Sequence, residues 1–211
     1  MLFFRLYQRR LDIDSINHST EEDVMKLSIR QIVVSGLLGA ITIVLGVTRL
    51  GFIGPFPPLI LVSATILQIP AIIGGILEGP VVGLLIGLIF GLSSWLQAPT
   101  EQPPVNLWFS NPLVSILPRL FIGITAAYAY LALRKANEWL ALGVSAVVGT
   151  LTNTILVVGA IVLFGYAPLA VIGPAVLPNS IAEIVVSIVI VSAVVGAWKG
   201  LAFRRKQGSS V

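Results

Sequence analysis

Apolar residues form six long runs along the chain, separated by short segments rich in glycine and proline. A hydrocarbon core of about 30 Å needs roughly 20 helical residues, and each run is close to that length. The pattern therefore predicts an all-α integral membrane protein, a bundle of six transmembrane helices. We place these helices at Arg30 to Leu50, Leu59 to Leu77, Pro80 to Gln97, Pro112 to Leu133, Glu138 to Phe164 and Ala175 to Lys199.

The distribution of basic residues predicts how this bundle is oriented. Of the 13 Lys and Arg residues, Arg49 and Arg119 alone fall outside the two tails and the loop that contains Arg134 and Lys135. Cationic residues stay on the cytoplasmic side of short loops, so we expect both termini in the cytoplasm. The predicted organisation is a cytoplasmic N-terminal extension (residues 1–28), a membrane domain (29–200) and a basic cytoplasmic tail (201–211).

Composition agrees with a membrane protein and excludes several kinds of site. Mean hydropathy is +0.99 and only 10% of residues are charged, against about a quarter in soluble proteins. The chain has no cysteine and one histidine, His18, so we expect no metal site and no cofactor. Its pI of about 9.8 reflects basic residues that flank the membrane, where they meet lipid headgroups, and we expect no nucleic-acid partner.

The few polar side chains inside the predicted helices are candidates for function, because burying such groups in a membrane is costly. Counted at about 1.5 Å per residue from the outward helix ends, four of them lie roughly 10 to 16 Å deep on four helices. We therefore predict a small-molecule cavity in the outer half, beneath long loops that contribute further groups. The candidate binding residues are Arg119, Asn153, Asn179, Glu183, Gln68, Asn106 and Trp108.

Other interpretations of these polar residues stay open. Arg119 and Glu183 can form a buried structural ion pair while the amides only bridge helices, as in a membrane scaffold. A stand-alone carrier or channel would need a polar path into the cytoplasmic half, and the sequence offers none. The chain contains no GxxxxGK[ST], HExxH or GxSxG motif, so we expect neither an enzyme nor an ATPase.

Small residues on the first helix predict a close helix contact. Ser35 and Gly39 form one small-xxx-small pair, and Gly36 and Ala40 form an overlapping one. Such pairs let another helix backbone approach closely. The other helix can belong to this chain or to a partner.

These residues resemble the substrate-binding S components of energy-coupling factor (ECF) vitamin transporters, from about Arg30 to Lys199. Besides the small residues of the first helix and the pair Asn179 and Glu183, the resemblance is carried by three segments. They are Ile69–Pro80, Asn111–Arg119 and Gly149–Thr154.

The resemblance implies six helices with cytoplasmic ends in a prokaryotic plasma membrane. It also implies a water-soluble vitamin bound in the outer half, beneath the loops after the first and third helices. Gly36 and Ala40 stand where the family has an Ala-xxx-Ala type motif that docks on a T component carrying two ATPases. Pantothenate and cobalamin are the leading vitamins, and Arg119 would suit the carboxylate of pantothenate unless Glu183 already occupies it.

Overall fold

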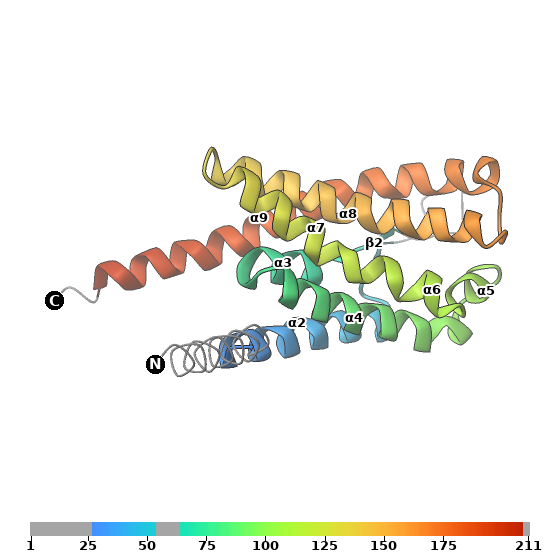
Figure 1. Ribbon diagram of the computed structural model, residues 1–211, viewed down its shortest axis with the longest axis horizontal. Coiled ribbons are helices and arrows are strands. Elements are labelled where there is room, and N and C mark those ends of the chain that lie inside the picture. The colour runs from blue at the N-terminus through green and yellow to red at the C-terminus, as the bar shows by residue number, and fades with distance from the viewer. Residues whose placement is uncertain (1–26, 54–63, 209–211) are drawn as a thin grey trace, which may run out of the picture. The chain divides into compact units, whose positions relative to one another are not determined.

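The computed structural model describes residues 27–53 and 64–208, with no side chains described at residue 175 or at 201–208. The chain separates into two compact units, Met1–Ile32 and Val33–Val211, and the packing and cavity contacts reported below belong to the second. Most of the predicted N-terminal extension and part of the loop after the first helix therefore lie outside the described residues. The elements, shown in Figure 1, are α2 (Ile29–Val47), β1 (Phe52–Ile53), β2 (Ala64–Thr65), α3 (Ile69–Glu78), α4 (Pro80–Gln97), η1 (Ala98–Thr100), α5 (Val105–Phe109), α6 (Pro112–Ser115), α7 (Leu117–Leu133), α8 (Glu138–Leu163) and α9 (Leu169–Gly208).

The protein is an all-α membrane protein with a single two-residue β-ladder, β1–β2, among its described elements. Many large apolar side chains on the long helices are exposed, as expected of surfaces that face lipid, whereas buried polar side chains gather inside the bundle. Five described segments are long and apolar enough to cross a membrane: Ile29–Val47, Pro80–Thr100, Pro112–Leu133, Glu138–Leu163 and Val176–Gly200.

The predicted second transmembrane helix is wrong in its extent. The structure has α3, which begins at Ile69 and has 10 residues, about 15 Å and half of a membrane core. Before it, Ala64 and Thr65 pair antiparallel with β1. Pro70 lies in the first turn of α3, where its missing N–H and fixed φ are tolerated. The apolar run was long enough for a spanning helix, but Ala64 and Thr65 within it are extended.

The last helix is longer than predicted at both ends. It begins at Leu169, runs through Pro174 and Pro178, and ends at Gly208 within the predicted basic tail. Pro174 was predicted to end the preceding loop and Pro178 to lie in the first turn of the helix, but both lie inside α9. A membrane helix tolerates proline where neighbouring groups satisfy the freed carbonyls. The preceding turn is short, because Gly165 adopts a φ of 72° after the last turn of α8.

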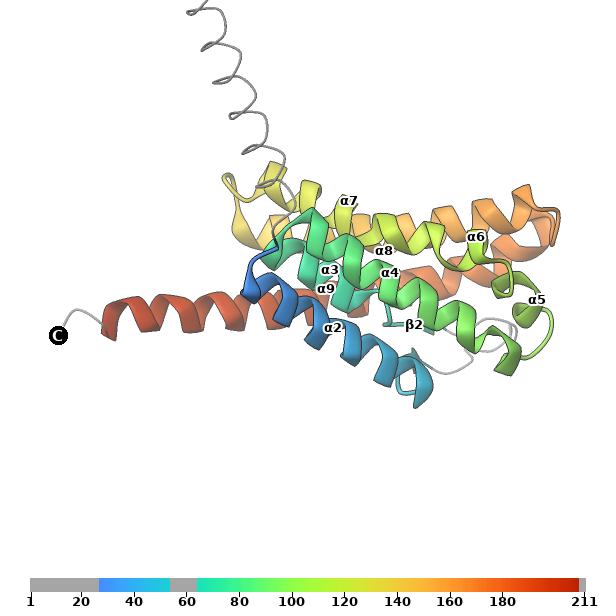
Figure 2. The ribbon, with the colours of Figure 1, turned by 60° about the horizontal axis from the view of Figure 1, so that its bottom comes forward.

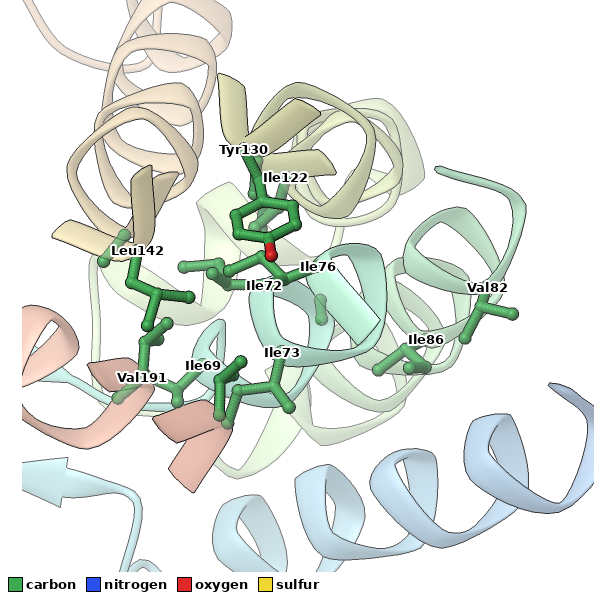
Figure 3. Packing of buried hydrophobic residues seen from close by; sticks show 14 of the residues in the cluster. Ile69, Ile72, Ile73, Ile76, Val82, Ile86, Ile122, Tyr130, Leu142 and Val191 are labelled. Carbon is green, nitrogen blue, oxygen red and sulfur yellow. The ribbon is translucent and has the colours of Figure 1, made fainter. Parts of the chain in front are cut away.

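The short helix α3 lies at the centre of the main apolar core. Its residues from Ile69 to Ile76 are all buried, so the helix is surrounded by other elements on every side. Figure 3 shows its isoleucines pointing toward side chains of α4, α7, α8 and α9, such as Ile86, Ile122, Leu142 and Val191. A half-length helix fits here because its residues from Ile69 to Ile76 are covered by protein.

Glycines bring α4 and α7 into backbone contact along one seam. A Cβ built on Gly83 would lie 2.7 Å from the Gly123 carbonyl carbon, and one on Gly91 would lie 2.7 Å from the Ile116 Cα. Between them, a Cβ on Gly87 would collide with the Arg119 carbonyl oxygen. This seam fixes the height at which Arg119 enters the bundle.

Helix α2 runs beside α4 in the views of Figures 1 and 2. The contact is close where side chains are small: a Cβ on Gly39 would lie 2.5 Å from Ile89 Cδ1. At the far end of the bundle, Lys199 donates to the Tyr130 hydroxyl and the Glu138 carboxylate, which ties α9 to α7 and α8.

Candidate functional site

A cavity of about 390 Å³ lies among α4, α5, α7, α8 and α9. Most of its wall is apolar, with a few polar and charged groups, the usual composition of a small-molecule site. Its polar lining residues fall into a buried group and a more exposed group. The buried group contains Arg119, Asn153, Asn179, Ser180 and Glu183, and the partly or fully exposed group contains Arg49, Thr65, Ser94, Gln97, Glu101, Gln102 and Thr154.

Arg119 is held at the cavity wall by a local feature of its own sequence. Pro118 has no N–H, so the carbonyl of Val114, one turn earlier, lacks its usual helical donor. Arg119 Nη1 donates to that carbonyl at 2.5 Å. The guanidinium also lies against two aromatic rings, with Cζ 5.4 Å from the centre of Phe90 and 4.7 Å from that of Phe109.

The Arg119 side chain has no carboxylate partner among the described residues. It is only 4% exposed, and its Nε donates no hydrogen bond in the part of the chain that the structure describes. No salt bridge joins Arg119 to Glu183 among the described residues, although the two charges attract each other. A buried cation without a salt bridge can accept a ligand anion.

Glu183 is engaged elsewhere. Its Oε1 accepts from the backbone N–H of Thr65 at 2.7 Å, and its Oε2 accepts from Gln68 Nε2 at 3.5 Å. These bonds join α9 to the residues just before α3. Glu183 lines the cavity but also anchors the strand β2, so its position serves the fold as well as the cavity wall.

Asn153 and Asn179 reach the cavity from α8 and α9. Asn153 is 9% exposed, and its Oδ1 accepts no hydrogen bond within the described residues. Buried polar atoms are normally satisfied, so this oxygen is suited to receive a donor from a ligand. Asn179 is buried on the same face of α9 as Glu183, as their spacing predicted.

The remaining candidates are divided. Trp108 on α5 is buried and lines the cavity. Gln68 is fully buried but lies behind the wall, where it accepts from the Thr65 hydroxyl at 3.2 Å and donates to Glu183. Asn106 accepts from the N–H of Leu107 at 2.8 Å and does not reach the cavity. The structure thus brings five of the seven predicted residues to one cavity.

Sequence reasoning missed the charged pair in the exposed part of the wall. Arg49 Nη1 lies 2.5 Å from Glu101 Oε1, and both residues line the cavity. A signal was present, because Arg49 stands at the outward end of the first predicted helix and Glu101 is the sole carboxylate in the loops predicted to face outward. Sequence reasoning also missed Phe90, which lies on α4 and whose ring contacts the Arg119 guanidinium.

The four small residues of α2 face two ways. Ser35 and Gly39 are buried, and Gly39 packs against Ile89 of α4, so in this structure the first pair serves packing within the chain, the alternative that the sequence left open. Gly36 and Ala40 are exposed, and a Cβ on Gly36 would meet nothing within 4 Å. Only the second pair is available to a partner helix.

The arrangement can bind a small polar molecule but shows no nucleophile with an adjacent base on the described cavity wall. Arg119 offers donors to an anion, Asn153 offers an acceptor, and the apolar wall fits a short aliphatic body. The described residues contain no group of three or more His, Cys, Asp or Glu that could hold a metal. A few polar groups on an apolar wall therefore suit the binding of a small polar molecule.

Comparison with known proteins agrees with this chemistry. The chain is 32% identical over 163 residues to the pantothenic acid transporter PanT of Lactococcus lactis subsp. cremoris (strain MG1363). The match covers 68% of this chain and 79% of that protein. The family described as "ECF transporter, substrate-specific component" matches residues 30–195. Since that match covers most of the sequence, the chain belongs to the substrate-specific components of ECF transporters.

Proposed function

We propose that this protein is the substrate-binding component of an ECF transporter that takes up pantothenate across a prokaryotic plasma membrane. The observation that carries the proposal is the buried guanidinium of Arg119, which lines the cavity without a carboxylate partner among the described residues. Pantothenate carries one carboxylate at the end of a short chain with an amide and hydroxyls. Its carboxylate would pair with Arg119, and a hydroxyl or amide N–H would donate to Asn153.

Two further observations favour pantothenate over cobalamin, the other leading vitamin. The relative that matches this chain is named for pantothenic acid transport. The cavity of about 390 Å³ lies at the low end of small-molecule sites, whereas cobalamin, with its corrin ring and nucleotide loop, is several times larger than pantothenate.

The energy for uptake would come from partner subunits, a T component and two ATPases, since the chain lacks a phosphate-binding loop. Both termini would lie in the cytoplasm, with the cavity opening outward, as the basic residues predict. A channel or stand-alone carrier is the alternative to this proposal.

Isothermal titration of the detergent-purified chain with pantothenate tests the proposal. We expect one site that cobalamin does not occupy, and a loss of affinity of about tenfold to a hundredfold in Arg119→Gln, since a charge-assisted hydrogen bond is worth about 1.5 to 3 kcal/mol. Arg134→Gln is the matched control, because Arg134 lies at the end of α7 away from the cavity.

The outcomes separate the alternatives. Equal affinity in Arg119→Gln and in the parent would exclude the proposed carboxylate contact. Absence of pantothenate binding by a folded chain would reject this vitamin and leave another substrate, or the scaffold function, as the explanation.

A further inference from the structure

The exposed part of the cavity wall is where the cavity meets the surface. The Arg49 and Glu101 side chains are 45% and 21% exposed, whereas the polar groups at the other end of the cavity are buried. The wall runs along α4 from Phe90, beside Arg119, to Gln97 at the end of the helix, a rise of about 10 Å. Arg49 and Glu101 therefore lie at the mouth.

At this mouth, Arg49 joins two segments that are distant in the sequence. Its guanidinium pairs with Glu101 at 2.5 Å and lies 3.5 Å and 3.4 Å from the carbonyl and hydroxyl oxygens of Thr100. The turn after α2 is thereby attached to the segment after α4. Gly46 adds a contact in the same region, because a Cβ there would lie 3.0 Å from Gln97 Nε2.

The backbone of Arg49 adds a second, independent observation. Its φ is 61°, in the left-handed region that non-glycine residues adopt uncommonly and that persists where the surroundings hold it. The turn is closed by Gly51 N–H, which donates to the Leu45 carbonyl at 2.9 Å. The Arg49 guanidinium also lies 5.1 Å from the centre of the Phe52 ring. This conformation directs a long cationic side chain across the mouth instead of away from it.

We propose that the Arg49–Glu101 ion pair is a latch across the cavity mouth, which must open for a ligand to enter or leave. A single half-exposed ion pair contributes little to stability, which suits a contact that has to break repeatedly. The hydrogen-bonding oxygens of Thr100 and the Phe52 ring define the closed position to which Arg49 returns. The latch acts on access to the cavity, whatever molecule the cavity binds.

The absence of natural cysteine allows a test that needs no ligand. Ser94, which lines the cavity between Phe90 and Gln97, is replaced by cysteine, and its rate of reaction with a neutral, water-soluble methanethiosulfonate reagent is measured. We expect Arg49→Gln and Glu101→Gln each to raise this rate about threefold to tenfold, in line with the small energy of an exposed pair. The charge reversal Arg49→Glu/Glu101→Arg should return the rate toward that of the parent.

Two controls keep the result specific. Arg134→Gln should leave the Ser94→Cys rate unchanged, and Lys135→Cys, in an exposed loop, reports the intrinsic reactivity of the reagent in each background. If a latch variant does not fold, high salt replaces it: screening should accelerate the reaction with the intact pair. Salt should have no such effect in a folded variant that lacks one partner.

Equal rates in all backgrounds, together with no response to salt, would overturn the latch. Acceleration by only one of the two neutral variants would assign the effect to that side chain and overturn the pair. Failure of pantothenate to bind would leave these rates unaffected, so the latch and the proposed vitamin are tested separately.

Discussion

Asn153 and Glu183 are both buried polar residues of the cavity, but they differ in what they contact. Glu183 accepts two hydrogen bonds from residues that precede α3, whereas Asn153 Oδ1 accepts none within the described residues. Removing an acceptor that receives no hydrogen bond costs little stability. Removing one that already accepts hydrogen bonds leaves the buried donors unsatisfied. Truncation of Asn153 should therefore leave the stability of the fold nearly unchanged, whereas truncation of Glu183 should lower it.

We expect Asn153→Ala to lower pantothenate affinity about tenfold while changing the free energy of unfolding by less than about 0.5 kcal/mol. Glu183→Ala should destabilise the protein by about 1 to 3 kcal/mol, because the Thr65 N–H and the Gln68 amide lose their acceptor. Thermal unfolding in detergent and titration with pantothenate measure the two effects. Loss of stability in both variants with unchanged affinity would favour the scaffold function instead.

Single residues show how far the sequence could predict this site. Arg119, Asn153 and Asn179 were placed at a cavity because costly polar groups at similar depth on different helices indicate a common interior surface. Gln68 was predicted inside the second transmembrane helix, but it precedes α3 and lies behind Glu183. Its position depends on the β1–β2 pairing and on a bond to α9, two long-range contacts that local hydropathy does not encode.

At the scale of elements, the lengths of α3 and α9 were the least predictable features. A run of apolar residues satisfies the requirements of a spanning helix and of a buried extended segment equally well. The glycine spacing on α4 is more informative, since Gly83, Gly87 and Gly91 recur on one helix face, a pattern typical of close helix packing. In the structure, this face of α4 packs against the backbone of α7 and the residue just before it.

The α4–α7 seam predicts a strong effect at Gly87. Because an added Cβ would collide with the Arg119 backbone, Gly87→Ala should separate the helices and cost about 1 to 3 kcal/mol of stability. The displaced turn carries Arg119, so pantothenate affinity should fall as well. Gly143→Ala is the matched control, because a Cβ at Gly143 meets nothing within 4 Å. Equal melting temperatures and affinities for the two variants would contradict this account of the seam.

At the scale of the whole molecule, α2 has a buried face and an exposed face, and its small residues are divided between the two. Ser35 and Gly39 face the bundle, whereas Gly36 and Ala40 face outward beside exposed apolar side chains such as Leu37. By size and spacing alone the two pairs were equivalent, and only the family resemblance singled out Gly36 and Ala40. In the structure, the position of α4 beside α2 distinguishes the two pairs.

This division predicts which substitutions affect assembly with the proposed T component. Gly36→Leu should leave folding and pantothenate binding intact, since space surrounds Gly36, but should lower recovery of the T component and ATPases on co-purification about tenfold or more. Gly39→Leu should instead destabilise the isolated chain, because its side chain would overlap Ile89. Co-expression with the partners, followed by affinity purification and a thermal melt of each variant alone, measures both effects. If Gly36→Leu retained its partners fully, docking would have to use another face of the protein, and the exposed pair on α2 would serve only contact with lipid.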